Sequence, residues 1–262
     1  MLFARQFRPA AQSAVRQLAS SLRPAYLTVA YYAMLILFGL VCLAVSLPAT
    51  LLGLLMPTDR SGPYGRRMIQ AAFRVFLAAA RASGVLRCND RSLDVLRWDR
   101  PLIIAPNHPS ILDAVFVLAR LPEAVCLMKA PIWDNVFLGG GARFAGYIRN
   151  DAPLPMVRSA ARALKSGQQL LIFPEGTRTR SGPVEPFTGG FALIAKATGV
   201  AVQTLIIESN IPTGGWRTSL LKPPPLPLTY RLRLGRRFEQ PCPPHALVRD
   251  VEAYVRREIA RT

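Results

Sequence analysis

The sequence predicts an α/β protein in which helices flank a mostly parallel central sheet, preceded by a hydrophobic helix pair that anchors the chain to a membrane. From residue 85 onward, short apolar runs alternate with helical patterns, which is typical of parallel sheets. Near the N-terminus, residues 24–58 form one long uncharged stretch. The 262 residues, 51% of them hydrophobic, suit one globular domain with a membrane-seeking surface.

The uncharged stretch is longer than one membrane span needs. As a helix, residues 24–58 would measure about 52 Å, whereas a bilayer core of about 30 Å needs only about 20 residues. Gly39 and Pro48 offer places to bend or break the helix, so a helix pair that dips into one leaflet competes with a single long, tilted span. Arginines flank the stretch on both sides, and the positive-inside rule then favours a re-entrant hairpin.

Residues 64–82 predict an amphipathic helix, with Met68, Ala72, Phe76 and Ala79 on one stripe. Such a helix either lies on the bilayer surface or faces the protein core, and the sequence leaves both open. A cleaved signal peptide is the weaker interpretation of the preceding stretch, because the apolar region starts late and is too long.

The rest of the chain contains five short apolar runs that predict strands. These cover residues 102–105, 124–128, 170–173, 200–207 and 228–234. Helical patterns cover residues 111–121, 155–165, 190–198 and 246–261. We therefore expect a basic segment and membrane anchor over residues 1–60, an amphipathic connecting helix over 61–84, and one further domain over 85–262.

The formal net charge of +18 requires an anionic partner or surface. Anionic membrane lipid and nucleic acid both qualify, but the apolar stretch favours lipid. No nucleic-acid motif or aromatic-rich basic platform is present, so we expect no nucleic-acid partner. The four Cys are scattered, without a C-x-x-C pair or a His at ligand spacing, which argues against a metal site and a disulfide framework.

Chemically reactive side chains follow the first buried strand. The run Pro101 to Pro106 leads directly into Asn107 and His108, with Asp113 five residues after the histidine. In open α/β sheets, ligands bind at the carboxyl ends of strands. This spacing lets a carboxylate orient and charge-stabilise an imidazole, so the pair is a candidate general base.

A second constellation, Phe173 to Arg180, also directly follows a buried strand. Gly176 permits a tight turn, Thr177 can donate from its side chain and backbone, and Arg178 can bind an anionic group through its planar fork. The segment is therefore a candidate oxyanion or phosphate cradle. The alternative is a charged surface turn in which Glu175 pairs with an arginine.

Together, N-H-x-x-x-x-D and the later F-P-E-G-T-R resemble the glycerolipid acyltransferase family, and specifically the bacterial 1-acylglycerol-3-phosphate (lysophosphatidic acid) acyltransferases. The resemblance covers roughly residues 85–235 and makes 85–262 the acyltransferase domain. The hydrophobic N-terminal helices also look like the membrane anchor of that family.

The resemblance implies that His108, oriented by Asp113, removes a proton from an acceptor hydroxyl, whose oxygen attacks an acyl thioester of coenzyme A or acyl carrier protein. The thioester supplies its own energy, so no cofactor or metal is implied. The default reaction converts the lysophospholipid 1-acylglycerol-3-phosphate to phosphatidic acid, at the cell inner membrane with the catalytic domain on the cytoplasmic side. The residues implied to bind substrate are Asn107, Glu175, Gly176, Thr177, Arg178 and Arg149.

One block departs from the family pattern. In the run Gly146 to Asp151, Arg149 lies closer to the glycine than the family's phosphate-holding arginine, and Asn150 stands where that arginine is expected. Either Arg149 substitutes, or it points elsewhere and the acceptor differs, for example a lyso-ornithine lipid or an aryl-polyene-type lipid. A more remote alternative is a serine hydrolase with Ser110 as the nucleophile, although G-x-S-x-G is missing.

Overall fold

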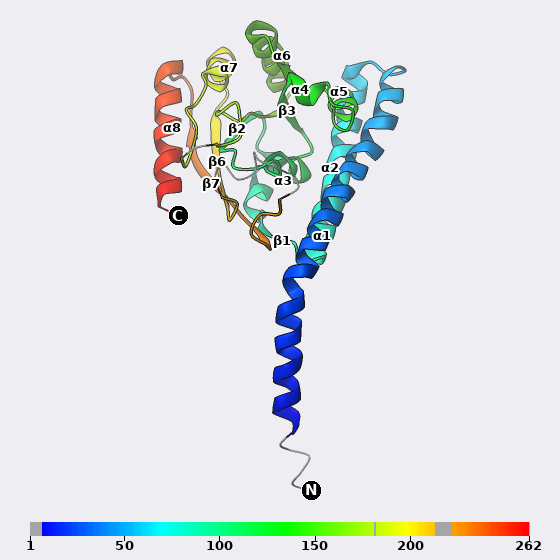
Figure 1. Ribbon diagram of the computed structural model, residues 1–262. Helices are drawn as coiled ribbons and strands as arrows, with labels where there is room; N and C mark the ends of the chain where they lie inside the picture. The colour runs from blue at the N-terminus through cyan, green and yellow to red at the C-terminus, as the bar shows by residue number, and fades with distance from the viewer. Residues whose placement is uncertain (1–6, 181, 213–221, 262) are drawn as a thin grey trace.

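The computed structural model describes residues 7–180, 182–212 and 222–261, apart from the side chains of residues 7–20, 58 and 59 (Figure 1). At its centre is a seven-stranded sheet with the order β1-β7-β6-β2-β5-β3-β4. The strands are β1 (Leu86–Asn89), β2 (Leu102–Pro106), β3 (Ala124–Lys129), β4 (Ile148–Asn150), β5 (Gln169–Leu171), β6 (Val202–Ser209) and β7 (Leu228–Phe238). Neighbouring strands are parallel except for β6 and β7, which confirms the predicted fold class.

All five predicted strands are present, and two further strands, β1 and β4, form the edges of the sheet. Both edge strands are short, and only the first residue of each is buried. Neither therefore contains the continuous apolar run that identified the central strands.

The centre of the sheet determines where the site lies. All five residues of β2 are buried between β6 and β5. Since β2 and β5 are parallel neighbours, with Ile104 opposite Leu171, the segments that follow them leave the sheet at the same edge. The two sequence motifs follow these two strands, so the fold brings them together.

Helices cover both faces of the sheet. They are α1 (Phe7–Gly53), α2 (Thr58–Ala82), η1 (Arg91–Trp98), α3 (Asp113–Arg120), α4 (Ala130–Trp133), α5 (Gly139–Phe144), α6 (Pro153–Lys165), α7 (Gly190–Thr198) and α8 (Pro244–Ala260). In Figure 1, α6, α7 and α8 follow one another along one side, while α1 and α2 lie on the other.

The apolar stretch forms one helix and does not fold back on itself. α1 continues through both Gly39 and Pro48, so the hairpin expected within residues 24–58 is wrong. Next to the proline, the Ser46 hydroxyl donates to the Phe137 carbonyl at 2.6 Å, and this packing against the segment around α5 supports the turn that Pro48 weakens. The N-terminal helix pair consists instead of α1 and α2, which run antiparallel.

By length and composition, α1 could cross a membrane. The most apolar 18-residue window of its segment Ser21–Gly53 has a mean hydropathy of 2.5, and only 17% of that window is buried within the protein. Leu51 in its last turn, and Leu54 and Leu55 directly after it, are among the exposed large apolar side chains. The apolar character of α1 is therefore directed largely outward.

α2 is the expected amphipathic helix, and its apolar face is part of the protein core. Ile69, Phe73, Phe76 and Leu77 are buried, a stripe shifted by about one residue from the expected one. Arg66 is also buried, and its Nη1 donates to the Ala145 carbonyl at 3.2 Å. The core-facing interpretation of this helix is thus correct.

Candidate active site

His108 and Asp113 meet where β2 gives way to α3. His108 lies in the connecting loop and Asp113 is the first residue of α3. The His108 Nδ1 and Asp113 Oδ2 atoms are 2.8 Å apart, and the Asp113 side chain is fully buried. Since Nδ1 faces the carboxylate, Nε2 is the ring nitrogen that can accept a proton from a substrate.

Hydrogen bonds from Ser110 hold the Asp113 carboxylate. The Ser110 backbone N–H donates to Oδ2 at 2.7 Å, and its hydroxyl donates to Oδ1, also at 2.7 Å. The Ser110 Oγ accepts in turn from the Tyr230 hydroxyl of β7 at 2.8 Å. Sequence reasoning missed Tyr230, because nothing in its strand pattern distinguishes it from a core residue.

These contacts contradict the serine hydrolase alternative. Ser110 is fully buried, and its hydroxyl is engaged by Asp113 and Tyr230. Ser110 does not line the cavity beside His108. It therefore orients the carboxylate and has no access to a substrate.

The imidazole is also fixed by stacking. The rings of His108 and Phe173 lie 3.9 Å apart between centroids at an interplanar angle of 21°. Phe173 is the first residue of the second motif, so the contact joins the segments after β2 and β5. With its plane held by Phe173 and one nitrogen held by Asp113, the ring has a defined orientation before any substrate binds.

Asn107 connects the loop after β2 to the neighbouring strand β6. Its Nδ2 donates to the Ile207 carbonyl at 2.9 Å, and its Oδ1 accepts from the Ile207 backbone N–H at 2.7 Å. Asn107 is buried and does not line the cavity. The structure therefore assigns it to positioning His108 and not to the substrate contact implied by the family resemblance.

Glu175 has a similar positioning role. Its Oε1 accepts from the His108 backbone N–H at 2.7 Å, and its Oε2 accepts from the Thr179 hydroxyl and the Glu185 N–H, both at 2.8 Å. Burial raises the pKa of Glu175, while these hydrogen bonds act in the opposite direction. The carboxylate thus joins the two motifs, and it is turned away from the cavity.

We expect Glu175→Gln to lower the free energy of unfolding by about 1–3 kcal/mol. The new amide nitrogen cannot accept a hydrogen bond. It would face at least one of the groups that now donate to the carboxylate, and that buried donor would lose its partner. Urea denaturation measures the loss. The control is Glu239→Gln, because Glu239 is 71% exposed beside Arg237 and its replacement should have little effect. Equal stability of the two variants would contradict this role for Glu175.

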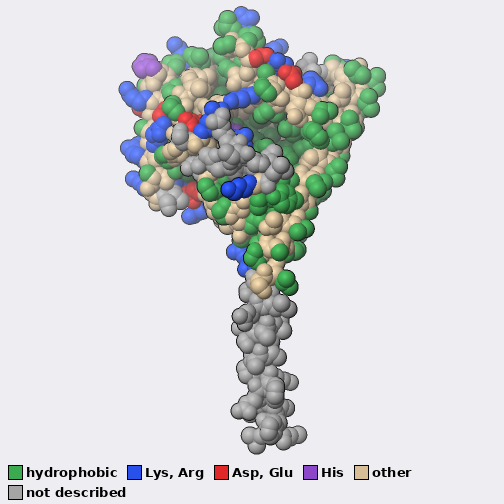
Figure 2. Space-filling model, viewed as in Figure 1, with side chains coloured by type: hydrophobic (Ala, Val, Ile, Leu, Met, Phe, Trp, Pro, Cys, Tyr) green, Lys and Arg blue, Asp and Glu red, His purple; other side chains and the backbone are tan. Residues whose placement is uncertain are grey.

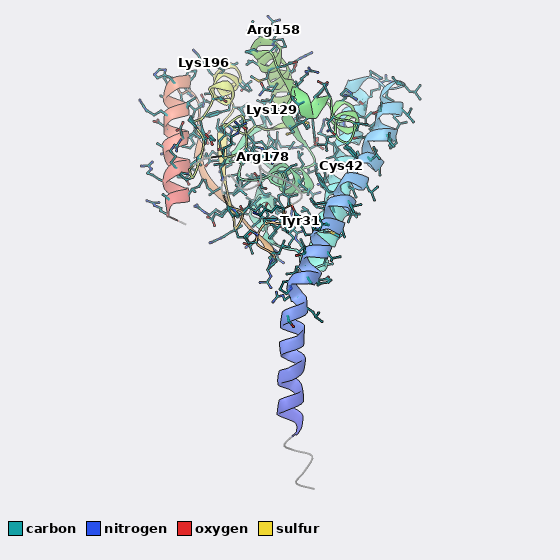
Figure 3. All side chains as sticks on the ribbon, in the orientation of Figure 1. Tyr31, Cys42, Lys129, Arg158, Arg178 and Lys196 are labelled. Atoms are coloured by element: carbon teal, nitrogen blue, oxygen red, sulfur yellow. The ribbon has the colours of Figure 1, made fainter. Side chains whose placement is uncertain are left out.

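A cavity of about 560 Å³ opens beside His108. Its polar end is lined by Gly176, Thr177, Arg178, Arg180 and Lys129. Its other end extends between α1, α2, α3 and β3, where the lining is apolar and includes Phe38, Val45, Ile69, Phe73 and Leu118. Figure 2 shows the hollow, and Figure 3 places Lys129 and Arg178 across it from Cys42 of α1. The cavity can hold a molecule with an anionic head and a long apolar tail.

The segment after β5 that the sequence predicts to be a cradle lines the polar end of the cavity. Gly176 has φ +62°, a left-handed conformation that favours glycine. Thr177 and Arg178 follow it along the cavity wall, and the Arg180 Nη2 donates to the Thr177 Oγ1 at 3.3 Å. Within the described part of the chain, no carboxylate lies in ion-pair range of Arg178, so its guanidinium is free to bind an anion.

Arg149 does not contribute to this cavity. It forms ion pairs with Asp134 at 2.9 Å and with Asp151, whereas its neighbour Asn150 lines the cavity. Adjacent residues of a strand point to opposite faces, so Arg149 does not take the place of the family's arginine. Lys129, whose strand partner is Asn150, supplies a positive charge there, and its position at the carboxyl end of a predicted strand could have indicated it.

The chain matches known acyltransferases in sequence. Residues 87–208 match the family model described as Acyltransferase. The human 1-acyl-sn-glycerol-3-phosphate acyltransferase beta is 27% identical over 188 residues, which cover 68% of this chain and 65% of that protein. The lyso-ornithine lipid O-acyltransferase of Pseudomonas aeruginosa is 35% identical over 114 residues, covering 42% and 43%. The chain spans about half the length of most curated relatives that it matches.

A solved structure shows the same fold over nearly the whole chain. The 1-acyl-sn-glycerophosphate (LPA) acyltransferase PlsC from Thermotoga maritima superposes with a TM-score of 0.62 at 20% identity, covering 92% of this chain and 96% of that one. The two sequence motifs, the geometry that joins them and the match over residues 87–208 agree with one another. Over residues 87–208 the chain is therefore similar in sequence to acyltransferases, among them the 1-acyl-sn-glycerol-3-phosphate acyltransferases.

Proposed function

We propose that this protein transfers an acyl chain from a thioester donor to the free hydroxyl of a lysophospholipid, with 1-acylglycerol-3-phosphate as acceptor and phosphatidic acid as product. The observation that carries the proposal is that His108, held by Asp113, lines the same cavity as a set of cationic side chains and a set of apolar ones. An anionic head bound near Arg178 would bring a glycerol hydroxyl to His108.

The reaction needs one general base. His108 Nε2 removes the proton from the acceptor hydroxyl as its oxygen bonds to the thioester carbonyl carbon. The tetrahedral intermediate then breaks the carbon–sulfur bond, and the leaving thiolate takes the proton from His108. Asp113 stabilises the imidazolium that exists between these two steps. The acyl group passes directly to the acceptor, so the enzyme forms no covalent intermediate.

The donor is an acyl thioester of coenzyme A or acyl carrier protein, which acts as a co-substrate. Because the thioester is already activated, the transfer requires no cofactor and no metal. The apolar end of the cavity provides an enclosed place for the acyl chain of the donor, which arrives from water on a soluble carrier. Both possible carriers are acidic, which suits a chain with a net charge of +18.

We further infer that the enzyme works at an anionic membrane surface, the inner membrane, with its catalytic domain on the cytoplasmic side. The outward apolar side chains of α1 support an attachment to lipid. The excess of Arg and Lys supports attraction to anionic headgroups. A soluble donor can then reach His108 while the acceptor remains in the lipid layer.

Thiol release from palmitoyl-coenzyme A tests the proposed function. With the purified protein in liposomes, we expect release that depends on added 1-acylglycerol-3-phosphate and is matched by formation of phosphatidic acid. Release that is independent of the acceptor would indicate a thioesterase and contradict acyl transfer. A lack of release both from palmitoyl-coenzyme A and from palmitoyl-acyl carrier protein, each tested with this acceptor, would exclude the proposed reaction.

Arg178→Ala should raise the KM for 1-acylglycerol-3-phosphate by about tenfold or more, because it removes a charged hydrogen-bond partner of the phosphate. The KM for the acyl donor should change much less. Arg158→Ala is the matched control, since Arg158 is exposed on α6 and lies outside the cavity (Figure 3). Steady-state kinetics with each substrate varied in turn measure both effects. An unchanged acceptor KM in the Arg178 variant would remove this residue from the head-group site.

A lyso-ornithine lipid is the second candidate acceptor. The specific observation is that Arg149 is bound by two carboxylates and does not line the cavity, which leaves fewer cations for a glycerol phosphate than the family pattern would provide. Competition between the two lipids under identical conditions distinguishes them. Preferential acylation of the lyso-ornithine lipid, with no inhibition by 1-acylglycerol-3-phosphate, would replace the first acceptor with the second.

A further inference from the structure

A second cavity of about 330 Å³ lies beside the catalytic one, on the inner side of α1. Along α1 its lining extends from Tyr31 to Cys42, a distance of about 16 Å for an α-helix; both residues are labelled in Figure 3. Its other walls come from α2, from the segment after His108 and from Leu228 at the start of β7. Neither the general base nor the cationic cradle lies in this cavity, so the catalytic steps do not require it.

The lining suits hydrocarbon and nothing else. All the residues that line it are apolar except Asn135 and the phenol of Tyr31, and none carries a charge. A charged head group would therefore lack a partner there, whereas an alkyl chain would lose only its contact with water. The volume lies at the lower end of the range of about 300–1,000 Å³ that is usual for ligand sites.

Gly39 is the residue of α1 whose missing side chain leaves part of the second cavity unfilled. It lies within the long α1 helix and lines only the second cavity, not the catalytic one. A Cβ atom at this position would meet nothing within 4 Å, so no close packing requires a glycine. Glycine inside a helix costs about 1 kcal/mol relative to alanine. The absent side chain leaves room in the cavity at the expense of helix stability.

The two cavities share a wall at the catalytic loop. Phe38 and Cys42 of α1 line both cavities, as do Ile111 and Leu138. Ile111 follows His108 by only three residues and is partly exposed. A molecule whose reacting hydroxyl lies at His108 can therefore extend an attached chain past Ile111 into the second cavity.

We propose that the second cavity binds the acyl chain that the acceptor already carries. The proposal rests on the acyl transfer proposed above, in which two long chains are present at one time. The deep end of the catalytic cavity is enclosed by buried side chains such as Ile69 and Phe73 and suits the chain of a soluble donor. The second cavity lies under α1, whose outer face carries exposed Ile36 and Leu40, and suits a chain that comes from the lipid layer. The substrate class is thus a lipid with one long chain.

A series of substitutions at Gly39 tests the assignment. Gly39→Leu and Gly39→Phe place increasing bulk in the second cavity, and the leucine variant should fold even if the phenylalanine variant does not. The measured quantity is the ratio of kcat/KM for a palmitoyl acceptor to kcat/KM for a hexanoyl acceptor. We expect this ratio to fall by about tenfold or more as bulk increases, while the preference among donor chain lengths stays the same. Leu40→Phe, which adds bulk on the exposed face of the same helix, is the control and should leave the ratio unchanged.

Binding to the His108→Ala variant separates this inference from the proposed reaction. With turnover removed, 1-palmitoylglycerol-3-phosphate should bind more weakly by a similar factor when Gly39→Leu is added. If wild-type protein transfers no acyl group but this loss of binding occurs, the proposed function fails and the assignment of the cavity stands. A variant that loses selectivity for the donor chain, or one in which neither chain is affected, would overturn the assignment.

Discussion

His108→Ala should lower kcat for acyl transfer by a factor on the order of 10²–10⁴, the usual contribution of a general base. Its Nε2 is the ring nitrogen that Asp113 leaves free, and in the proposed reaction this atom accepts the proton of the acceptor hydroxyl. The backbone contacts of residue 108 with Glu175 and Thr179 do not involve the imidazole. We therefore expect the fold to survive the substitution while turnover is lost.

Acceptor-dependent thiol release measures the effect, and circular dichroism with thermal unfolding checks the fold. His245→Ala is the matched control, because His245 is exposed on α8 and does not line the catalytic cavity. Full activity in the His108 variant would show that another group accepts the proton. Loss of activity in both variants would show that the assay reports a general effect of removing histidine.

Asp113→Asn should reduce turnover by a factor on the order of 10⁴, as expected when the carboxylate that orients a catalytic histidine becomes an amide. Asp113 now accepts from Ser110 twice and from His108 Nδ1. An amide group has only one oxygen, so its nitrogen would face Ser110 or His108. If it donates to Nδ1, the ring proton moves to Nε2, which can then no longer accept a proton from the substrate.

The loss should appear in kcat, with little change in either KM, because Asp113 is fully buried and contacts no substrate. Ser110→Ala is an informative companion variant. It removes one donor to Asp113 and keeps the charge, so we expect a smaller loss than in Asp113→Asn. A variant Asp113→Asn with near-normal kcat would show that the charge of the carboxylate is unnecessary.

The sequence predicted the central part of the fold because burial and periodicity are local signals. Strands such as β2 and β6 are buried along most of their length, and helices such as α6 and α8 bury residues that recur at helical spacing. The path of α1 could not be derived in this way. Gly39 and Pro48 mark places where a helix can break, but whether it breaks depends on packing with distant residues, here the contact of Ser46 with Phe137.

The candidate site shows the same division. His108 and Asp113 lie five residues apart, so their contact can be predicted from their spacing alone. Gly176, Thr177 and Arg178 are consecutive residues, so their grouping could also be predicted from the local sequence. Tyr230, by contrast, reaches Ser110 across 120 residues of sequence, and the direction of Arg149 depends on Asp134 in another segment. Contacts of this kind are set by strand order and register, which no local pattern contains.

The hydrogen bond from Tyr230 to Ser110 extends the surroundings of Asp113 beyond the region that matches the family model. The family match ends at residue 208, yet Tyr230 lies beyond it, on the strand that pairs with β6. A fragment cut at that boundary would retain His108, Ser110 and Asp113 but lose Tyr230, the outer end of their hydrogen-bond chain. The smallest portion of this protein able to keep the Asp113 carboxylate in its native surroundings therefore includes β7, and a division of the gene after residue 208 would separate side chains that are hydrogen-bonded to one another.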